Sequence, residues 1–84
     1  MPTPILLPDL RAGAVTLSVW YAEPGEPVME GERVVEVLAD GATVDVLAPA
    51  SGRLAEKCVF FGDPLTAGMV LGVIDEIPNI GGVS

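Results

Sequence analysis

The feature that most constrains the fold is a pattern of turn and apolar residues that occurs twice in the chain. The segment 25–28, Gly-Glu-Pro-Val, returns at 62–65 as Gly-Asp-Pro-Leu. The register continues on both sides, where Gly31 corresponds to Gly68, Leu17 to Leu54, Val34 to Leu71 and Val37 to Ile74. Two similar halves, each made of a strand, a tight turn and a second strand, predict a fold with a pseudo-two-fold axis.

The runs between the turns have the period of β-strands. In segment 14–22, Val15, Leu17 and Val19 alternate with Thr16 and Ser18. The same alternation occurs in the segments 32–39, 43–48, 53–61 and 69–75. Segment 5–7 precedes a proline, which cannot donate to a ladder, so we expect an edge strand there. Short alternating runs bounded by Gly and Pro predict an all-β sandwich or barrel.

Length and charge limit the possible functions. The 84 residues predict one domain, which we place at 1–76, with 77–84 as a flexible tail or the start of a linker. The net charge of −8 argues against nucleic acid, whose phosphates need Lys and Arg. It serves solubility or steers the domain toward a basic docking surface. No apolar run is long enough to cross a bilayer. We expect a monomer that binds no membrane.

The single cysteine and the absence of histidine narrow the chemistry. Cys58 has no partner for an internal disulfide, which favours the cytoplasm. It lies among Val59, Phe60 and Phe61, so we expect a buried, inert thiol. Without histidine, no catalytic triad or histidine–metal site can be built. We therefore expect no catalytic and no metal-binding residues.

Two further groups of residues have both a structural and a functional interpretation. Glu30, Glu32 and Glu36 lie around a turn and a strand start, and we favour a solvated face over a metal site. Trp20 and Tyr21 end a strand, and we favour packing over partner binding. Neither group points to a reaction.

A tight hairpin is expected at Asp40 and Gly41. Alternating runs flank this Asp-Gly pair, and a two-residue type I′ turn needs positive φ at both central positions. Asp and Gly tolerate that conformation, so the local physics alone explains the turn.

The same segment carries a resemblance to a known family. The sequence resembles a lipoyl domain of the biotinyl/lipoyl-carrier family, of the type found in the acyltransferase of 2-oxo acid dehydrogenase complexes. The resemblance runs from about Leu7 to Asp75. It includes "LPDLRAG", "EPGEPVMEGERVVEV", "GDPLTAGMVLGVID" and the more specific "ATVDVLAPASGRL". It implies a flattened β-barrel, or barrel-sandwich hybrid, of two four-stranded antiparallel sheets.

One residue departs from the family pattern. The resemblance implies a lipoyl group on the lysine of an Asp-Lys-Ala triplet at the hairpin tip, and here that triplet is Asp40-Gly41-Ala42. Glycine has no side-chain amine to which such a group could be attached. The one lysine, Lys57, lies in the second half, where the repeat pairs it with Trp20. We therefore expect no cofactor-binding residue and no cofactor, neither lipoate nor biotin.

The sequence leaves several functions open. The first is a lipoyl-like module without lipoyl-lysine, recognised by a 2-oxo acid dehydrogenase component or a lipoyl-handling enzyme. The second is a swinging-arm carrier that uses Lys57, or one non-catalytic domain of a larger acyltransferase. The third is an assembly domain. An independent enzyme is the least favoured, because the chain shows no catalytic constellation.

Overall fold

The computed structural model describes residues 1–76, and every regular element among them is a β-strand. In chain order the strands are β1 (Pro2–Leu6), β2 (Val15–Trp20), β3 (Pro27–Val28), β4 (Arg33–Ala39), β5 (Ala42–Leu47), β6 (Gly52–Lys57), β7 (Pro64–Leu65) and β8 (Val70–Asp75). The tail predicted at 77–84 lies outside the described residues.

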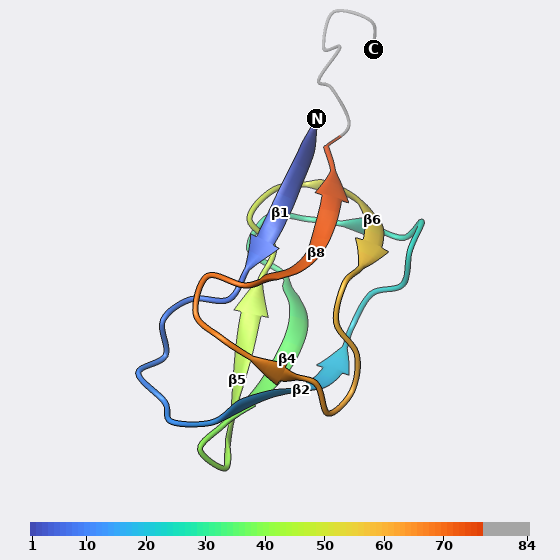
Figure 1. The fold of residues 1–84 in the computed structure, drawn as a ribbon. Helices are drawn as coiled ribbons and strands as arrows, with labels where there is room; N and C mark the ends of the chain where they lie inside the picture. Colours follow the sequence, from blue (N-terminus) through green and yellow to red (C-terminus); the bar gives the residue numbers. More distant parts are fainter. Residues whose placement is uncertain (77–84) are drawn as a thin grey trace, which may run out of the picture.

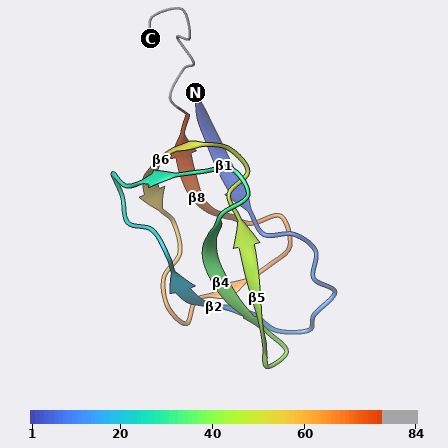
Figure 2. The ribbon, with the colours of Figure 1, turned by 180° about the vertical axis from the view of Figure 1, so that it is seen from behind.

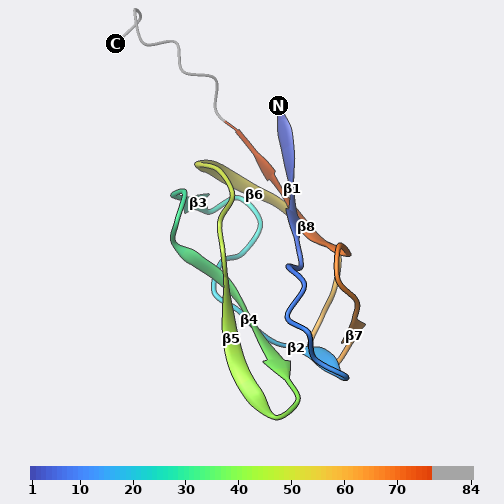
Figure 3. The same cartoon turned by 90° about the vertical axis from the view of Figure 1, so that its left-hand side faces the viewer.

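The strands form two antiparallel sheets of four. One sheet has the order β1-β8-β6-β3 and the other β5-β4-β2-β7 (Figures 1, 2 and 3). The all-β prediction and the two four-stranded sheets are confirmed. The barrel is not closed, because within residues 1–76 no strand ladder joins one sheet to the other. The molecule is a sandwich in which each sheet keeps two edges.

Main-chain hydrogen bonds confirm the repeat position by position. The N–H of Gly25 donates to the carbonyl of Leu54 at 2.7 Å, and the N–H of Gly62 donates to that of Leu17 at 2.9 Å. The Gly-acid-Pro turn of each half is thus hydrogen-bonded to a strand of the other half. The pseudo-two-fold relation is therefore built from reciprocal bonds between the halves.

The core lies between the two sheets and takes residues from both halves. Its most deeply buried side chains are Ile5, Leu7, Leu17, Val34, Val35, Val37, Leu54, Leu71 and Ile74. No polar or charged residue is buried in the described part of the chain. The core is thus purely apolar, as a domain of this size requires to be stable.

Trp20 closes one side of the sandwich. Its indole N–H donates to the carbonyl of Val59 at 2.9 Å. A Cβ on Gly72 would lie 2.8 Å from the Trp20 ring and 2.8 Å from the carbonyl of Glu56. The ring therefore occupies the space that the missing side chain leaves, and the packing role expected for Trp20 is confirmed.

Irregularities in the ladders change which residues face the core. The register between β2 and β4 shifts between Leu17 and Val19, and Val19 is 40% exposed although Leu17 is buried. The ladder between β4 and β5 shifts between Arg33 and Val35, and both Val34 and Val35 are buried. A bulge resets the alternation of faces, so strict alternation predicts Val19 wrongly.

The expectation that Cys58 is buried is wrong. Strand β6 ends at Lys57, four residues before the end of the predicted run, and Cys58 is exposed. Of its apolar neighbours only Val59 enters the core, whereas Phe60 and Phe61 are exposed. Partial desolvation and, to a lesser extent, the charge of Glu56 raise the pKa of the thiol, which therefore stays protonated at neutral pH.

No helix in residues 1–76 has the length and apolar character needed to span a bilayer.

The close approach at Gly72 leads to a first prediction. Gly72→Ala should lower the free energy of unfolding by about 1–3 kcal/mol, because the added methyl group overpacks the space held by Trp20 and the Glu56 carbonyl. Gly13→Ala is the matched control, since its Cβ would meet only Asp40 at 3.5 Å. Urea unfolding of both variants measures the difference. Equal stabilities would show that the ring yields to the methyl group without cost.

Candidate functional site: the hairpin tip and its supporting loop

The tip of the β4–β5 hairpin is a tight turn at one end of the molecule. Asp40 has φ +48° and Gly41 has φ +86°, the pair of positive angles expected for a type I′ turn between Ala39 and Ala42. Figure 3 shows this hairpin projecting away from the end at which the N-terminus lies. The turn predicted from Asp-Gly is confirmed. A Cβ on Gly41 would have no atom within 4 Å, so the tip is open to solvent.

Asp40 connects the tip to the loop between β1 and β2. Its carboxylate accepts the N–H of Gly13 at 3.0 Å and that of Ala14 at 2.9 Å. Its own N–H donates to the carbonyl of Ala14 at 2.9 Å. We call this set of three bonds the Asp40 clamp. The N–H groups of Gly13 and then Ala14 lower the pKa of the Asp40 carboxyl, because they stabilise its charged form.

The clamped loop forms one wall of a pocket beside the tip. The pocket has a volume of about 190 Å³ and is lined by the loop from Leu7 to Gly13, by Val15 and by residues 65–67. Within the loop, Asp9 accepts the N–H of Arg11 at 2.9 Å, and Arg11 has φ +57°. This bond holds a non-glycine residue in a conformation that is uncommon for it. Segments 7–14 and 40–42 together are called the tip–loop surface below.

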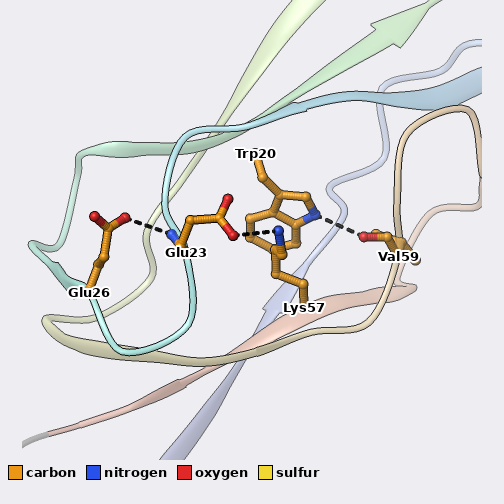
Figure 4. A network of polar contacts seen from close by, with 5 residues as sticks. All are labelled: Trp20, Glu23, Glu26, Lys57 and Val59. Atoms are coloured by element: carbon orange, nitrogen blue, oxygen red, sulfur yellow. Dashed lines mark hydrogen bonds and ion pairs between the residues drawn. The ribbon is translucent and has the colours of Figure 1, made fainter.

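Lys57 lies away from this surface, on β6 of the other sheet. Its Nζ is 2.9 Å from Oε1 of Glu23, and 19% of its side chain is exposed. Glu26 accepts the N–H of Glu23 at 2.7 Å and orders the same turn, as Figure 4 shows. The one lysine of the chain is therefore partly covered and paired with a carboxylate.

The remaining candidates have structural roles. Glu30 and Glu32 are exposed, whereas Glu36 accepts hydrogen bonds from the hydroxyls of Ser18 and Tyr21, each at 3.1 Å. These three glutamates do not converge, and residues 1–76 hold no cluster of three or more groups that could bind a metal ion. The Arg33 guanidinium lies 4.6 Å from the centre of the Tyr21 ring, a cation–π contact on the sheet surface.

Comparison with known proteins identifies the family. The sequence model of the family described as "Biotin-requiring enzyme" matches residues 3–74. Because the match covers nearly all of the described chain, the protein belongs to this biotin/lipoyl family. The resemblance inferred from the sequence motifs is confirmed.

Two relatives in which the chain matches one part are succinyltransferase components of the same name. The chain is 38% identical over 61 residues to the dihydrolipoyllysine-residue succinyltransferase component of the 2-oxoglutarate dehydrogenase complex of Azotobacter vinelandii, covering 73% of this chain and 15% of that protein. It is 32% identical over 74 residues to the Escherichia coli K12 protein of the same name, covering 86% of this chain and 18% of that one. The chain thus spans less than a fifth of the length of these relatives.

A solved structure confirms the fold. The solution structure of the lipoyl domain of the 2-oxoglutarate dehydrogenase complex from Azotobacter vinelandii matches with a TM-score of 0.64 and 33% identity. The match covers 83% of this chain and 87% of that one. The chain therefore has the fold of a lipoyl domain.

These findings correct the expectation that no cofactor is involved. The relatives are named for a dihydrolipoyllysine residue, which is a lysine that carries a lipoyl group. The exclusion of lipoate was drawn from one residue and is wrong for a domain of this family. The tip itself does not fit an amide-linked group, because Gly41 offers no amine and neither of its neighbours does. The one side-chain amine of the chain is that of Lys57.

Sequence reasoning found the turn but missed the contact that supports it. Nothing in the spacing of Asp40 and Gly13 indicates that they meet, because they lie on separate segments brought together by the fold. The small residues at 13 and 14 are the only available signal, since they permit a close approach of carboxylate and backbone.

The Asp40 clamp predicts a pH dependence. The pKa of Asp40 is lowered in the folded state, so its stabilising effect is complete above the unfolded value of about 3.9 and is lost as pH falls through the folded value. Asp40→Asn should therefore be less stable than the native chain at pH 6, and the difference should shrink below about pH 4. Unfolding by urea at a series of pH values measures this. A difference that stays constant down to pH 2 would contradict the clamp.

Proposed function

We propose that this domain is the lipoyl-domain module of a 2-oxo acid dehydrogenase acyltransferase, and that it works by presenting the tip–loop surface to another protein of the complex. The observation that carries the proposal is the Asp40 clamp. It joins the tip and the loop into one surface of fixed geometry, so a partner can bind this surface without the entropy cost of ordering it first. The domain itself performs no chemistry in this function.

The charge of the chain supports a protein partner. The net charge of −8 favours a basic docking surface and speeds the encounter with it. The relatives are components of the 2-oxoglutarate dehydrogenase complex, so another component of such a complex is the proposed partner. A lipoyl-handling enzyme is the second partner that the same surface would suit.

The names of the relatives favour a second function, that of a carrier. In this version the chain bears an acyl-transferring group on Lys57, the one side-chain amine. The ion pair with Glu23 at 2.9 Å and the partial burial of the side chain oppose it, because a modifying enzyme must first release the amine. The attachment site would also lie on a strand of the sheet opposite the hairpin.

The intact mass of the protein from its natural source separates the two functions. The mass of an unmodified domain favours recognition by the tip–loop surface. An added lipoyl or biotinyl mass that maps to Lys57 favours the carrier, and Lys57→Arg should then abolish the addition. Peptide mapping of the same sample provides the assignment.

The geometry of the tip predicts the behaviour of an engineered amine. Gly41→Lys should remain folded and become a substrate for lipoate–protein ligase, because a side chain at 41 would project into open solvent. The positive φ should cost about 1–2 kcal/mol of stability. Mass spectrometry after incubation with ligase, lipoate and ATP measures the modification.

Gly25→Lys is the matched control, since it also places a lysine at an open turn position with positive φ. We expect it to stay unmodified, because it lacks the hairpin and the clamped loop. A folded Gly41→Lys protein that resists modification would show that this tip is not the surface such enzymes recognise.

A further inference from the structure

The two outer strands β1 and β5 occupy equivalent places in the pseudo-two-fold fold. Each is the edge strand of its sheet and pairs with one neighbour, β1 with β8 and β5 with β4. The residues that follow them make matching bonds. The N–H of Leu7 donates to Met69 at 3.0 Å, and the N–H of Ala48 donates to Glu32 at 2.7 Å. Leu7 and Ala48 are therefore equivalent positions.

These bonds determine which main-chain groups face outward. In an antiparallel ladder, the N–H and C=O of every second residue bond to the neighbouring strand. The N–H and C=O of the residues between them point away from that strand, which on an edge strand means toward solvent. Ala48 bonds inward, as does Ala42 beside the two-residue turn. The outward positions of β5 are therefore Thr43, Asp45 and Leu47.

The equivalent outward positions of β1 are mostly proline. Leu7 bonds inward, and the carbonyl of Met1 accepts the N–H of Glu76 at 3.0 Å, so the outward residues are Pro2, Pro4 and Leu6. A proline at such a position removes the N–H that a foreign strand would bind. One edge of the fold is therefore blocked, and its counterpart is not.

The edge of β5 remains available for pairing. Within residues 1–76, no backbone hydrogen bond outside the ladder with β4 involves a residue of β5. The side chains of Thr43, Asp45 and Leu47 are all exposed. This edge presents donors and acceptors at the spacing that an added strand requires.

Charge determines what can add to this edge. Two copies of the chain would each bring a net charge of −8. If two β5 strands paired antiparallel with their outward positions 43, 45 and 47 matched, Asp45 would lie opposite Asp45. An extended segment with a basic side chain beside Asp45 would instead gain an opposite-charge pair. The cation near Asp45 is Arg33, whose Nη1 lies 3.8 Å from the carboxylate, and 40% of the Asp45 side chain is still exposed to solvent.

We propose that the free edge of β5 binds an extended basic peptide segment of a partner protein by antiparallel strand addition. The main-chain groups of Thr43, Asp45 and Leu47 supply the hydrogen bonds, and Asp45 selects for lysine or arginine. This edge adjoins the tip at Ala42 but uses none of the residues of the tip–loop surface, and the proposal does not rest on the proposed function.

The test uses a capped hexapeptide of alternating lysine and valine as the probe. On titration into the ¹⁵N-labelled domain, the amide resonances of Thr43, Asp45 and Leu47 should shift and their hydrogen exchange should slow. Thr43→Pro removes the outward N–H of β5 at the position where β1 has Pro2. The variant should bind the peptide about five- to tenfold more weakly, because it loses the hydrogen bond of that N–H and weakens the adjacent main-chain hydrogen bond. The variant should fold, because β1 accommodates Pro2 at the equivalent position.

Two further variants complete the design. Asp45→Asn should weaken binding about two- to threefold and reduce its salt dependence. Asp40→Asn, which removes the clamp, should leave peptide affinity unchanged and so separates this site from the tip. A capped hexapeptide of alternating glutamate and valine should bind at least tenfold more weakly.

Three results would overturn the proposal. They are the absence of shifts at β5 with millimolar peptide, an unchanged affinity in Thr43→Pro, and shifts centred on the tip–loop surface. Sedimentation of the free domain provides the remaining check. A dimer that Thr43→Pro dissociates would mean that a second copy, and not a basic peptide, occupies the edge.

Discussion

The structure depends on one constraint, which is that two small sheets must each bury one face against the other with no polar residue between them. The nine most deeply buried side chains come from both halves of the repeat, and residues 1–76 bury no polar or charged residue. A domain of this size buries a limited fraction of its surface, so any unpaired polar group inside it would be costly. The candidate functional groups of residues 1–76 consequently lie outside the core, at the hairpin tip, in its supporting loop, on the strand edge of β5 and, for the partly covered Lys57, on the outer face of β6.

Local signals explain how much of this fold the sequence predicts. The Gly-acid-Pro turns, the period-two runs and the Asp-Gly pair each act over a few residues, and the strands and the hairpin follow from them. The bulge that exposes Val19 and the early end of β6 that exposes Cys58 depend on pairing between strands. The Asp40 clamp likewise joins segments far apart in the chain. Contacts of this kind leave no local pattern, so the sequence predicts the turn of the candidate site but not the loop that supports it.

Family membership and the chemistry of the tip rest on different residues. The family match extends over residues 3–74, nearly the whole described chain, whereas the chemistry of the tip rests on the single position 41. A side chain at position 41 would touch nothing within 4 Å, so the fold places no demand on it beyond tolerance of positive φ. A glycine there satisfies the turn, and similarity of fold carries no information about what is attached at this point. For the same reason the glycine at the tip does not by itself exclude a cofactor from a domain of this family.

The two halves of the repeat have the same architecture, but their edge strands β1 and β5 differ in whether proline blocks further strand pairing. On the outer side of β1, prolines at two of the three outward positions remove the N–H groups that a further strand would bind. In contrast, β5 keeps its outward N–H groups and carries a single carboxylate among them. A charge on an edge strand is a common defence against self-association, and here the net charge of −8 adds to it. That defence acts only against strands of like charge. The edge of β5 keeps all its outward donors and repels copies of its own chain, so it is selective for basic partners. Because β5 also belongs to the hairpin that forms the tip, this one hairpin carries two surfaces of different chemistry.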